Sequence, residues 1–167
     1  MKNKLLIIAS CGLLLLAAGC KNDKDKEPEQ TTTQSQTLYG NMESPSWSAP
    51  ADYDMSSSMT AVVKVDLAAQ YPDKAADFQL NDKDLLAAFS GEECLGVASP
   101  QDGLFYLYIV TPSGSNGQIV NGQMIKLVYY SAHYKNLFEA ADAFPFANDT
   151  QQGTVATPFV PTLIVAK

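Results

Sequence analysis

Hydrophobic and polar residues alternate along several short stretches of the chain, with the period of two that is typical of β-strands. This alternation is clear over Met59–Asp66, and Leu104–Thr111 is rich in the aromatic and β-branched residues that strands favour. Leu85–Phe89 and Cys94–Ala98 flank a Ser-Gly-Glu-Glu turn, which predicts a β-hairpin. Two further strands are predicted, at Met124–Tyr130 and Thr162–Ala166.

Two segments are harder to assign. Leu67–Leu80 contains several Ala residues but is interrupted by Pro72, which favours a loop with one helical turn. Tyr134–Ala143 is compatible with a short helix or with an irregular strand, and both alternatives stay open. Because the other segments are short strands separated by turn signals, the pattern predicts an all-β fold. The expected architecture is an antiparallel β-sandwich, immunoglobulin-like or jelly-roll-like.

The first twenty residues have the pattern of a bacterial export signal. Lys2 and Lys4 precede the apolar run Leu5–Ala18, which would span about 21 Å as a helix, too little for the hydrocarbon core of a bilayer. The small residues before Cys20 resemble the lipobox of bacterial lipoproteins. That resemblance implies that residues 1–19 are a signal peptide and that acyl chains on Cys20 hold the protein on a membrane.

The next segment is polar and shows no apolar periodicity. Residues 20–46 contain a cluster of Lys and acidic residues followed by a Thr/Gln/Ser tract, which predicts a lipidated Cys and a flexible tether. The folded domain is then expected over residues 47–167. The charged cluster directly after Cys20 resembles the surface-export signal of Bacteroidetes lipoproteins. This implies an outer-membrane protein displayed on the cell surface, with the periplasmic face as the alternative.

Composition excludes several classes of function. The chain has 18 acidic residues against 11 basic ones, all Lys, and its net charge of −7 argues against nucleic acid as a partner. Removal of the signal peptide would leave Cys94 as the only free thiol, so no intrachain disulfide is expected. One His and one thiol leave little material for a nucleophile–base pair or a metal-ligand cluster, and the alternative of a Cys94–His133 dyad is disfavoured because the two residues lie about forty positions apart. We therefore expect no enzymatic activity, no metal and no cofactor.

Two carboxylates, Asp82 and Asp84, flank Lys83 directly before the predicted hairpin. Carboxylates at this spacing occur in Ca²⁺-binding loops, but a Ca²⁺ site needs six or more oxygen ligands. No further ligands follow at a suitable spacing. The sequence favours a solvated turn with an Asx cap at Asn81 or Asp82.

The aromatic residues supply the candidate binding site. Flat rings on one face of a sheet can stack against the apolar faces of sugars. The candidates are Tyr129, Tyr130, His133, Tyr134 and Trp47. The alternative is that the tyrosines pack in the core and at its rim, and that Trp47 is an N-terminal plug against the sandwich.

The predicted hairpin carries a recognisable string, because Asp84–Ala98 reads D-L-L-A-A-F-S-G-E-E-C-L-G-V-A. This string resembles a module of secreted and cell-surface Bacteroidetes proteins, whose hairpin ends in Glu-Cys-Arg-Gly-Val-Ala. Weaker matches follow in the same order, at Leu104–Ile109, Ile125–Ala132 and Gly153–Phe159. The resemblance implies a β-sandwich accessory module without established catalysis. One departure is Leu95, which stands where the module usually has Arg.

Two functions are compatible with these observations. The first is a non-catalytic surface module that binds glycan or protein. The second is a structural or assembly subunit of a larger surface complex or adhesive fibre, in which an edge strand pairs with a partner. An exposed row of aromatic side chains on one sheet face would favour the first function. A long, uncovered edge strand would favour the second.

Overall fold

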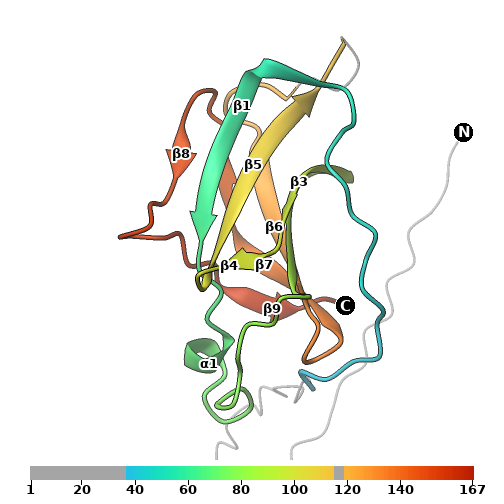
Figure 1. The fold of residues 1–167 in the computed structure, drawn as a ribbon, viewed down its shortest axis with the longest axis vertical. Helices are drawn as coiled ribbons and strands as arrows, with labels where there is room; N and C mark the ends of the chain where they lie inside the picture. The colour runs from blue at the N-terminus through green and yellow to red at the C-terminus, as the bar shows by residue number, and fades with distance from the viewer. Residues whose placement is uncertain (1–36, 115–118) are drawn as a thin grey trace, which may run out of the picture. The chain divides into compact units, whose positions relative to one another are not determined.

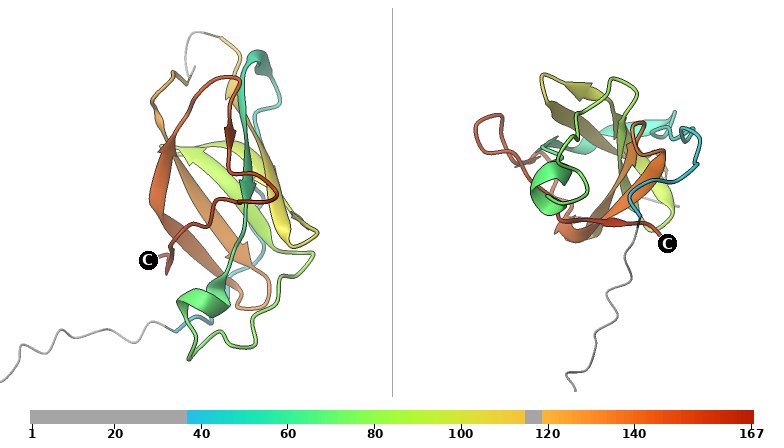
Figure 2. Two further views of the ribbon diagram at one scale, coloured as in Figure 1. Left: turned by 90° about the vertical axis from the view of Figure 1, so that its left-hand side faces the viewer. Right: turned by 90° about the horizontal axis from the view of Figure 1, so that it is seen from below.

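Two β-sheets packed face to face form the domain (Figures 1 and 2). The computed structural model describes residues 37–114 and 119–167, so the predicted signal peptide, Cys20 and the predicted tether before residue 37 lie outside the described residues. In spatial order, sheet A consists of β4 (Pro100–Gln101), β5 (Leu104–Pro112), β1 (Tyr53–Val63) and β8 (Gln151–Gln152). Sheet B consists of β3 (Glu93–Ala98), β2 (Leu85–Ser90), β6 (Met124–Ser131), β7 (Asn136–Pro145) and β9 (Leu163–Val165).

The strand pairing confirms the predicted all-β antiparallel sandwich. All neighbouring strands are antiparallel, except that β8 runs parallel to β1. The predicted hairpin is β2–β3, and Gly91 in its turn has a φ of 59°, a conformation that suits glycine. The ambiguous segment after Tyr134 is the strand β7, not a helix. The Ala-rich segment forms the single helical turn α1 (Leu67–Gln70), and Asp66 caps it by accepting a hydrogen bond from the Ala69 backbone N–H.

Alternation along the strands places one set of side chains between the sheets. Sheet A contributes Met59, Ala61 and Val63 from β1 and Phe105, Leu107 and Ile109 from β5. Sheet B contributes a matching set, which includes Leu86, Ala88, Ile125, Leu127 and Tyr129. All of these side chains are buried, and removing their apolar surface from water is the main term that stabilises the fold. No helix among the described residues is long and apolar enough to cross a membrane.

The chain before β1 packs against the domain, in contrast to the predicted tether. This N-terminal strap (residues 37–50) begins with Leu38, which is buried in the core. The backbone N–H groups of Gly40 and Met42 donate to the carbonyl oxygens of Tyr134 and Lys135, at 2.8 and 2.9 Å. The boundary predicted at Trp47 is therefore wrong, because Leu38 supplies an apolar anchor inside a segment that is otherwise polar.

The strap lies over the outer face of sheet B. Phe89 and Tyr130 point away from the core, since they alternate with the core residues Ala88 and Tyr129. The Trp47 ring meets Phe89 edge-on, at 5.7 Å between ring centroids, and the Tyr130 hydroxyl donates to the Met42 carbonyl. In Figure 1 the strap, drawn in blue to cyan, runs along the sandwich toward the start of β1.

Three of the four described sheet edges are short or bonded to neighbouring chain. The outer side of β1 bonds to the chain at 150–159, through pairs such as Thr60 N–H to the Thr150 carbonyl at 3.0 Å. On β9, the Leu163 N–H donates to the Gln70 side chain and the Leu163 carbonyl accepts from the Tyr71 hydroxyl, each at 2.7 Å. At the β3 edge, a Cβ on Gly96 would clash with the Tyr108 carbonyl, so β3 lies directly against β5. The edges at β4, β8 and β9 are therefore short, whereas β3 is a six-residue edge strand whose only strand partner is β2.

Candidate binding face

The tyrosines of the predicted platform are buried. Tyr129 and Tyr134 are 0% exposed and Tyr130 is 5% exposed. Tyr129 points into the core by strand alternation and meets Phe105 edge-on, while Tyr130 points outward but is covered by the strap. The prediction that these three rings form a stacking platform is therefore wrong. The alternative that they pack in the core and at its rim describes the structure.

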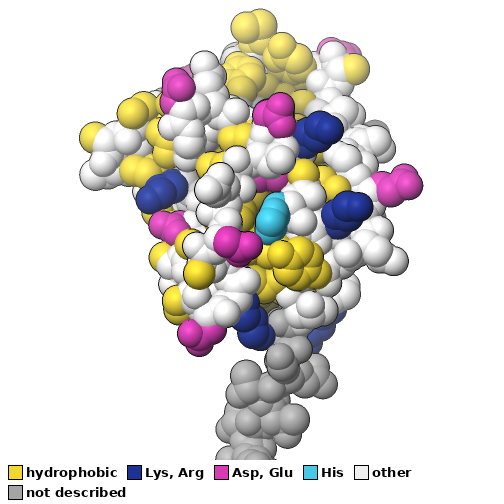
Figure 3. All heavy atoms as spheres, turned by 60° about the horizontal axis from the view of Figure 1, so that its bottom comes forward, with side chains coloured by type: hydrophobic (Ala, Val, Ile, Leu, Met, Phe, Trp, Pro, Cys, Tyr) yellow, Lys and Arg dark blue, Asp and Glu magenta, His cyan; other side chains and the backbone are white. Residues whose placement is uncertain are grey.

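The other two candidates do not join them on one face. His133 is exposed in the turn between β6 and β7, and its Nε2 lies 3.3 Å from the Tyr39 hydroxyl. Figure 3 shows this single histidine at the surface beside an apolar patch. Trp47 is half-buried against Phe89 on sheet B. This position agrees with the alternative interpretation, in which Trp47 packs against the sandwich as an N-terminal plug.

Asp84 is a buried carboxylate with three protein donors. One carboxylate oxygen accepts from the Tyr129 hydroxyl at 2.7 Å and from the Asn81 N–H at 2.9 Å, and the other accepts from the Ala132 N–H at 2.7 Å. Burial, followed by the neighbouring Asp84 charge, raises the pKa of Tyr129. The expectation of a solvated Asp84 is wrong, although the Lys83 N–H does bond to the Asn81 side chain in the predicted Asx turn. Asp84 joins the turn before β2 to the end of β6.

The Cys94 side chain is partly packed into the domain, which favours a structural role for its thiol over a reactive one. Its side chain is half-buried at the start of β3, and its sulfur lies 3.8 Å from the Gly96 carbonyl oxygen. Burial raises the pKa of the Cys94 thiol, which lowers the fraction of reactive thiolate at neutral pH. No group of three or more metal-ligating side chains occurs within residues 37–114 and 119–167.

Two tyrosines are exposed on the outer face of sheet A. Tyr106 and Tyr108 on β5 are 41% and 44% exposed, and they alternate with inward-facing core residues. Both rings therefore lie on the same side of the sheet. Across the β1–β5 ladder, Tyr106 is paired with Val62 and Tyr108 with Thr60.

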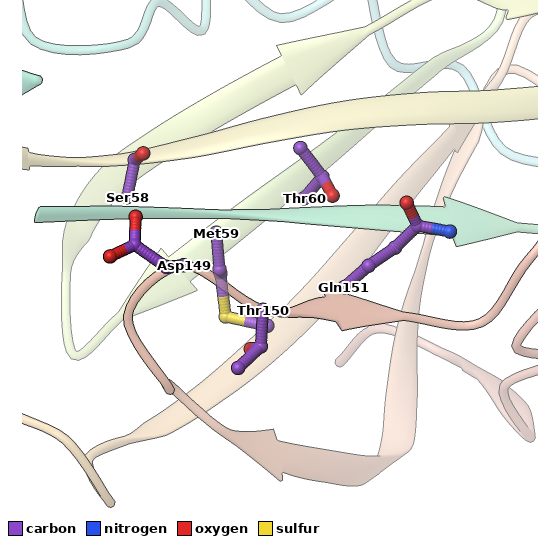
Figure 4. A pocket seen from close by; sticks show the side chains of 6 residues that line it. All are labelled: Ser58, Met59, Thr60, Asp149, Thr150 and Gln151. Atoms are coloured by element: carbon purple, nitrogen blue, oxygen red, sulfur yellow. The ribbon is translucent and has the colours of Figure 1, made fainter.

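A polar pocket lies between β1 and the chain at 149–151 (Figure 4). Its volume is about 310 Å³, and its lining consists of Ser58, Met59, Thr60, Asp149, Thr150 and Gln151. The Tyr108 hydroxyl donates to the Ser58 hydroxyl at 3.2 Å, and this bond joins the pocket to the exposed tyrosines of β5. In Figure 4 the Asp149 carboxylate lies next to Ser58, whereas Gln151 projects from β8. We call Tyr106, Tyr108 and this pocket the sheet A face.

Asn148 shapes the pocket by holding its loop against β1. Its side chain accepts from the Ser58 N–H and donates to the Ser56 carbonyl, each at 2.8 Å. These bonds fall where the pairing of β1 with β5 shifts register, between Asp54 and Ser58. Asp149 follows with a φ of 56°, a left-handed conformation that costs less for Asp than for most residues. The loop is thus fixed, and its Asp149 carboxylate stays beside β1.

The sheet A face offers hydrogen bonding and stacking, without a catalytic arrangement. The hydroxyls of Ser58 and Thr60, the Gln151 amide and the Asp149 carboxylate provide donors and acceptors. The Tyr106 and Tyr108 rings provide flat apolar area. His133, the single histidine, lies near Tyr39 at the β6–β7 turn instead of in this pocket.

Comparisons of the chain with models of protein families, with curated proteins and with solved structures found no match.

Proposed function

We propose that the protein is a lipid-anchored, non-catalytic binding module that holds glycan on the sheet A face. The observation that carries this proposal is the pair of exposed tyrosines on one strand, next to a pocket of hydroxyl, amide and carboxylate groups. Sugars present flat apolar faces ringed by hydroxyls. A stacking ring with adjacent hydrogen-bonding side chains matches both features.

The two sheets differ in how accessible their outer faces are. On sheet B, the strap covers Phe89 and Tyr130. On sheet A, Tyr106 and Tyr108 keep more than a third of their surface in solvent. This contrast supports sheet A as the ligand-binding side.

The assembly alternative receives less support from the described residues. Pairing with a partner strand needs a run of free backbone groups along a sheet edge. β4 and β8 have two residues each, and β9 is bonded to the side chains of Gln70 and Tyr71. These three edges therefore offer little surface for strand addition, and the assembly alternative would rest on β3, a six-residue edge strand whose only strand partner is β2.

Replacing the exposed rings tests the proposal. We expect the full chain, purified in detergent, to bind glycans on an array. Tyr106→Ala or Tyr108→Ala should weaken binding about fivefold each, and the double variant about 30-fold, because a stacked ring contributes about 1 kcal/mol. Affinities are then measured by calorimetry with an array hit.

Tyr39→Ala is the matched control, because this ring is 55% exposed and lies against His133 instead of on the sheet A face. It should leave glycan affinity unchanged. Thermal melts of all variants should stay close to the parent, since neither Tyr106 nor Tyr108 belongs to the core. A blank array, or a double variant that binds as well as the parent, would refute the proposal.

The anchor is tested separately. Cys20→Ala should release the protein from membranes while the domain keeps its melting transition, because acyl chains on this residue are the proposed attachment. The measurement is membrane fractionation after a high-salt wash, with Cys94→Ala as the control that should stay bound. Persistent membrane association of Cys20→Ala would rule out the anchor.

A further inference from the structure

We infer that the sheet A face selects uncharged oligosaccharides and discriminates against acidic ones, with Asp149 as the residue that sets this selectivity. The inference rests on the proposed function and specifies its ligand class. It is carried by the position of the Asp149 carboxylate in the pocket and by the lack of a cation among the lining side chains.

The residues around Asp149 do not neutralise it. The Ser58 and Thr60 hydroxyls and the Gln151 amide are uncharged, and the Asp149 backbone N–H is already bonded to the Ser58 carbonyl. Lys64 lies farther along β1, where its ammonium pairs with the Asp66 carboxylate at 3.3 Å. The pocket therefore carries a net negative charge at neutral pH.

The domain as a whole reinforces this local charge. Fourteen of the 18 acidic residues of the chain lie within 37–167, together with six of the 11 Lys. A uronate or sulfate group in the pocket would meet the Asp149 carboxylate as a like charge. Near a protein surface, repulsion between unit charges a few ångströms apart lowers affinity by about tenfold or more.

An uncharged sugar gains from the same carboxylate. One oxygen of the Asp149 carboxylate accepts a long hydrogen bond from the uncharged Asn148 side chain, at 3.4 Å. The carboxylate can still accept hydrogen bonds from sugar hydroxyls, and bonds to an ionised acceptor are stronger than those between neutral groups. The Ser58 hydroxyl can donate to another sugar oxygen, and the Gln151 amide, whose Nε2 already donates to the Gly153 carbonyl at 2.7 Å, has a second N–H for the same purpose. The pocket thus orients one sugar unit by its hydroxyls.

The two exposed tyrosines of β5 favour a ligand of more than one sugar unit. Side chains two apart on a strand are separated by about 7 Å, so Tyr106 and Tyr108 can each stack a different sugar of one chain. Because the Tyr108 hydroxyl contacts Ser58, the ring next to the pocket is Tyr108, and the chain extends from the pocket toward Tyr106. We therefore expect affinity to rise from monosaccharide to oligosaccharide.

A matched pair of polymers tests the selectivity. Binding of the full chain in detergent is measured against a neutral β-glucan and against the sulfated form of the same β-glucan, at low salt. The parent should bind the neutral polymer at least tenfold more tightly. Asp149→Asn, which suits the left-handed conformation and keeps an acceptor oxygen, should narrow this difference to about threefold or less.

Asp73→Asn is the control, because it removes one negative charge from an exposed position after α1, outside the pocket. It should leave the neutral-to-sulfated ratio unchanged. Equal or tighter binding of the sulfated polymer by the parent would overturn the selectivity and leave the proposed glycan-binding function standing. A ratio that does not respond to Asp149→Asn would overturn the role of Asp149. Loss of all glycan binding, on the array and with both polymers, would overturn the proposed function as well.

Discussion

Asp84→Ala is expected to lower the free energy of unfolding by about 3–5 kcal/mol, because it leaves buried donors without an acceptor. The carboxylate is 0% exposed, and it accepts from Tyr129, Asn81 and Ala132. A domain of this size is typically stable by only about 5–15 kcal/mol, so the variant should be close to the limit of folding. Urea denaturation followed by circular dichroism measures the loss.

Two milder variants distinguish the contribution of the hydrogen bonds to Asp84 from that of its negative charge. Tyr129→Phe removes one hydroxyl and leaves Asp84 bonded to two backbone N–H groups, so we expect a loss of about 1–2 kcal/mol. Asp84→Asn keeps one acceptor oxygen and should fall between the other two. A loss below about 1 kcal/mol for Asp84→Ala would show that these bonds contribute little to the fold.

Alkaline pH is expected to destabilise the domain steeply, with Tyr129 as a major cause. Burial, and then the Asp84 charge, raise the pKa of Tyr129 above the ordinary value of 10.0. In the unfolded chain the phenol ionises near that ordinary value, whereas in the folded domain it stays protonated. The stabilisation is therefore complete below about pH 10 and is lost as the pH rises above it, by up to about 1.4 kcal/mol per pH unit for one such group. Burial also raises the pKa of Tyr71 and of Tyr134, which adds to the slope.

The measurement is the free energy of unfolding from urea titrations between about pH 8 and pH 11.5. Tyr129→Phe should be less stable than the parent at pH 8 but should lose less stability as the pH rises. Tyr53→Phe, at an exposed ring, is the control and should keep the parent's slope. A parent whose stability does not change over this range would contradict the buried, protonated state of Tyr129.

The strand pattern was readable from the sequence because one face of most strands is buried. From Met59 onward in β1 and from Phe105 to Ile109 in β5, every second residue enters the core, so the period of two is strong in the sequence. The β2–β3 hairpin was readable for a related reason, since two apolar runs flank a turn that contains Gly91. The two-residue strands β4 and β8 were missed, because two residues carry no periodicity.

The binding face was harder to find, because alternation separates two faces without revealing what covers each one. Tyr130 alternates out of the core, yet the strap buries it, and the strap itself is polar apart from residues such as Leu38. Conversely, Tyr106 and Tyr108 lie in a strand that the sequence predicts clearly. Because they alternate with Phe105 and Leu107, which enter the core, the two tyrosines lie on the outer face. The pocket depended on Asn148 meeting β1 some ninety residues earlier, which no local pattern indicates.

The route by which the strap enters the domain has a mechanical consequence. Tension on the chain from its N-terminal side first reaches Leu38, which is anchored in the core, and the two backbone bonds to the turn that joins β6 and β7 of sheet B. A load on Tyr106 or Tyr108 acts on sheet A instead. The strap continues into β1 of sheet A, but as long as its anchors hold, a load between the N-terminal side and Tyr106 or Tyr108 is carried from sheet B to sheet A through the packed side chains of the core. Sliding one sheet over the other disturbs many contacts at once, whereas peeling a single edge strand breaks hydrogen bonds one after another.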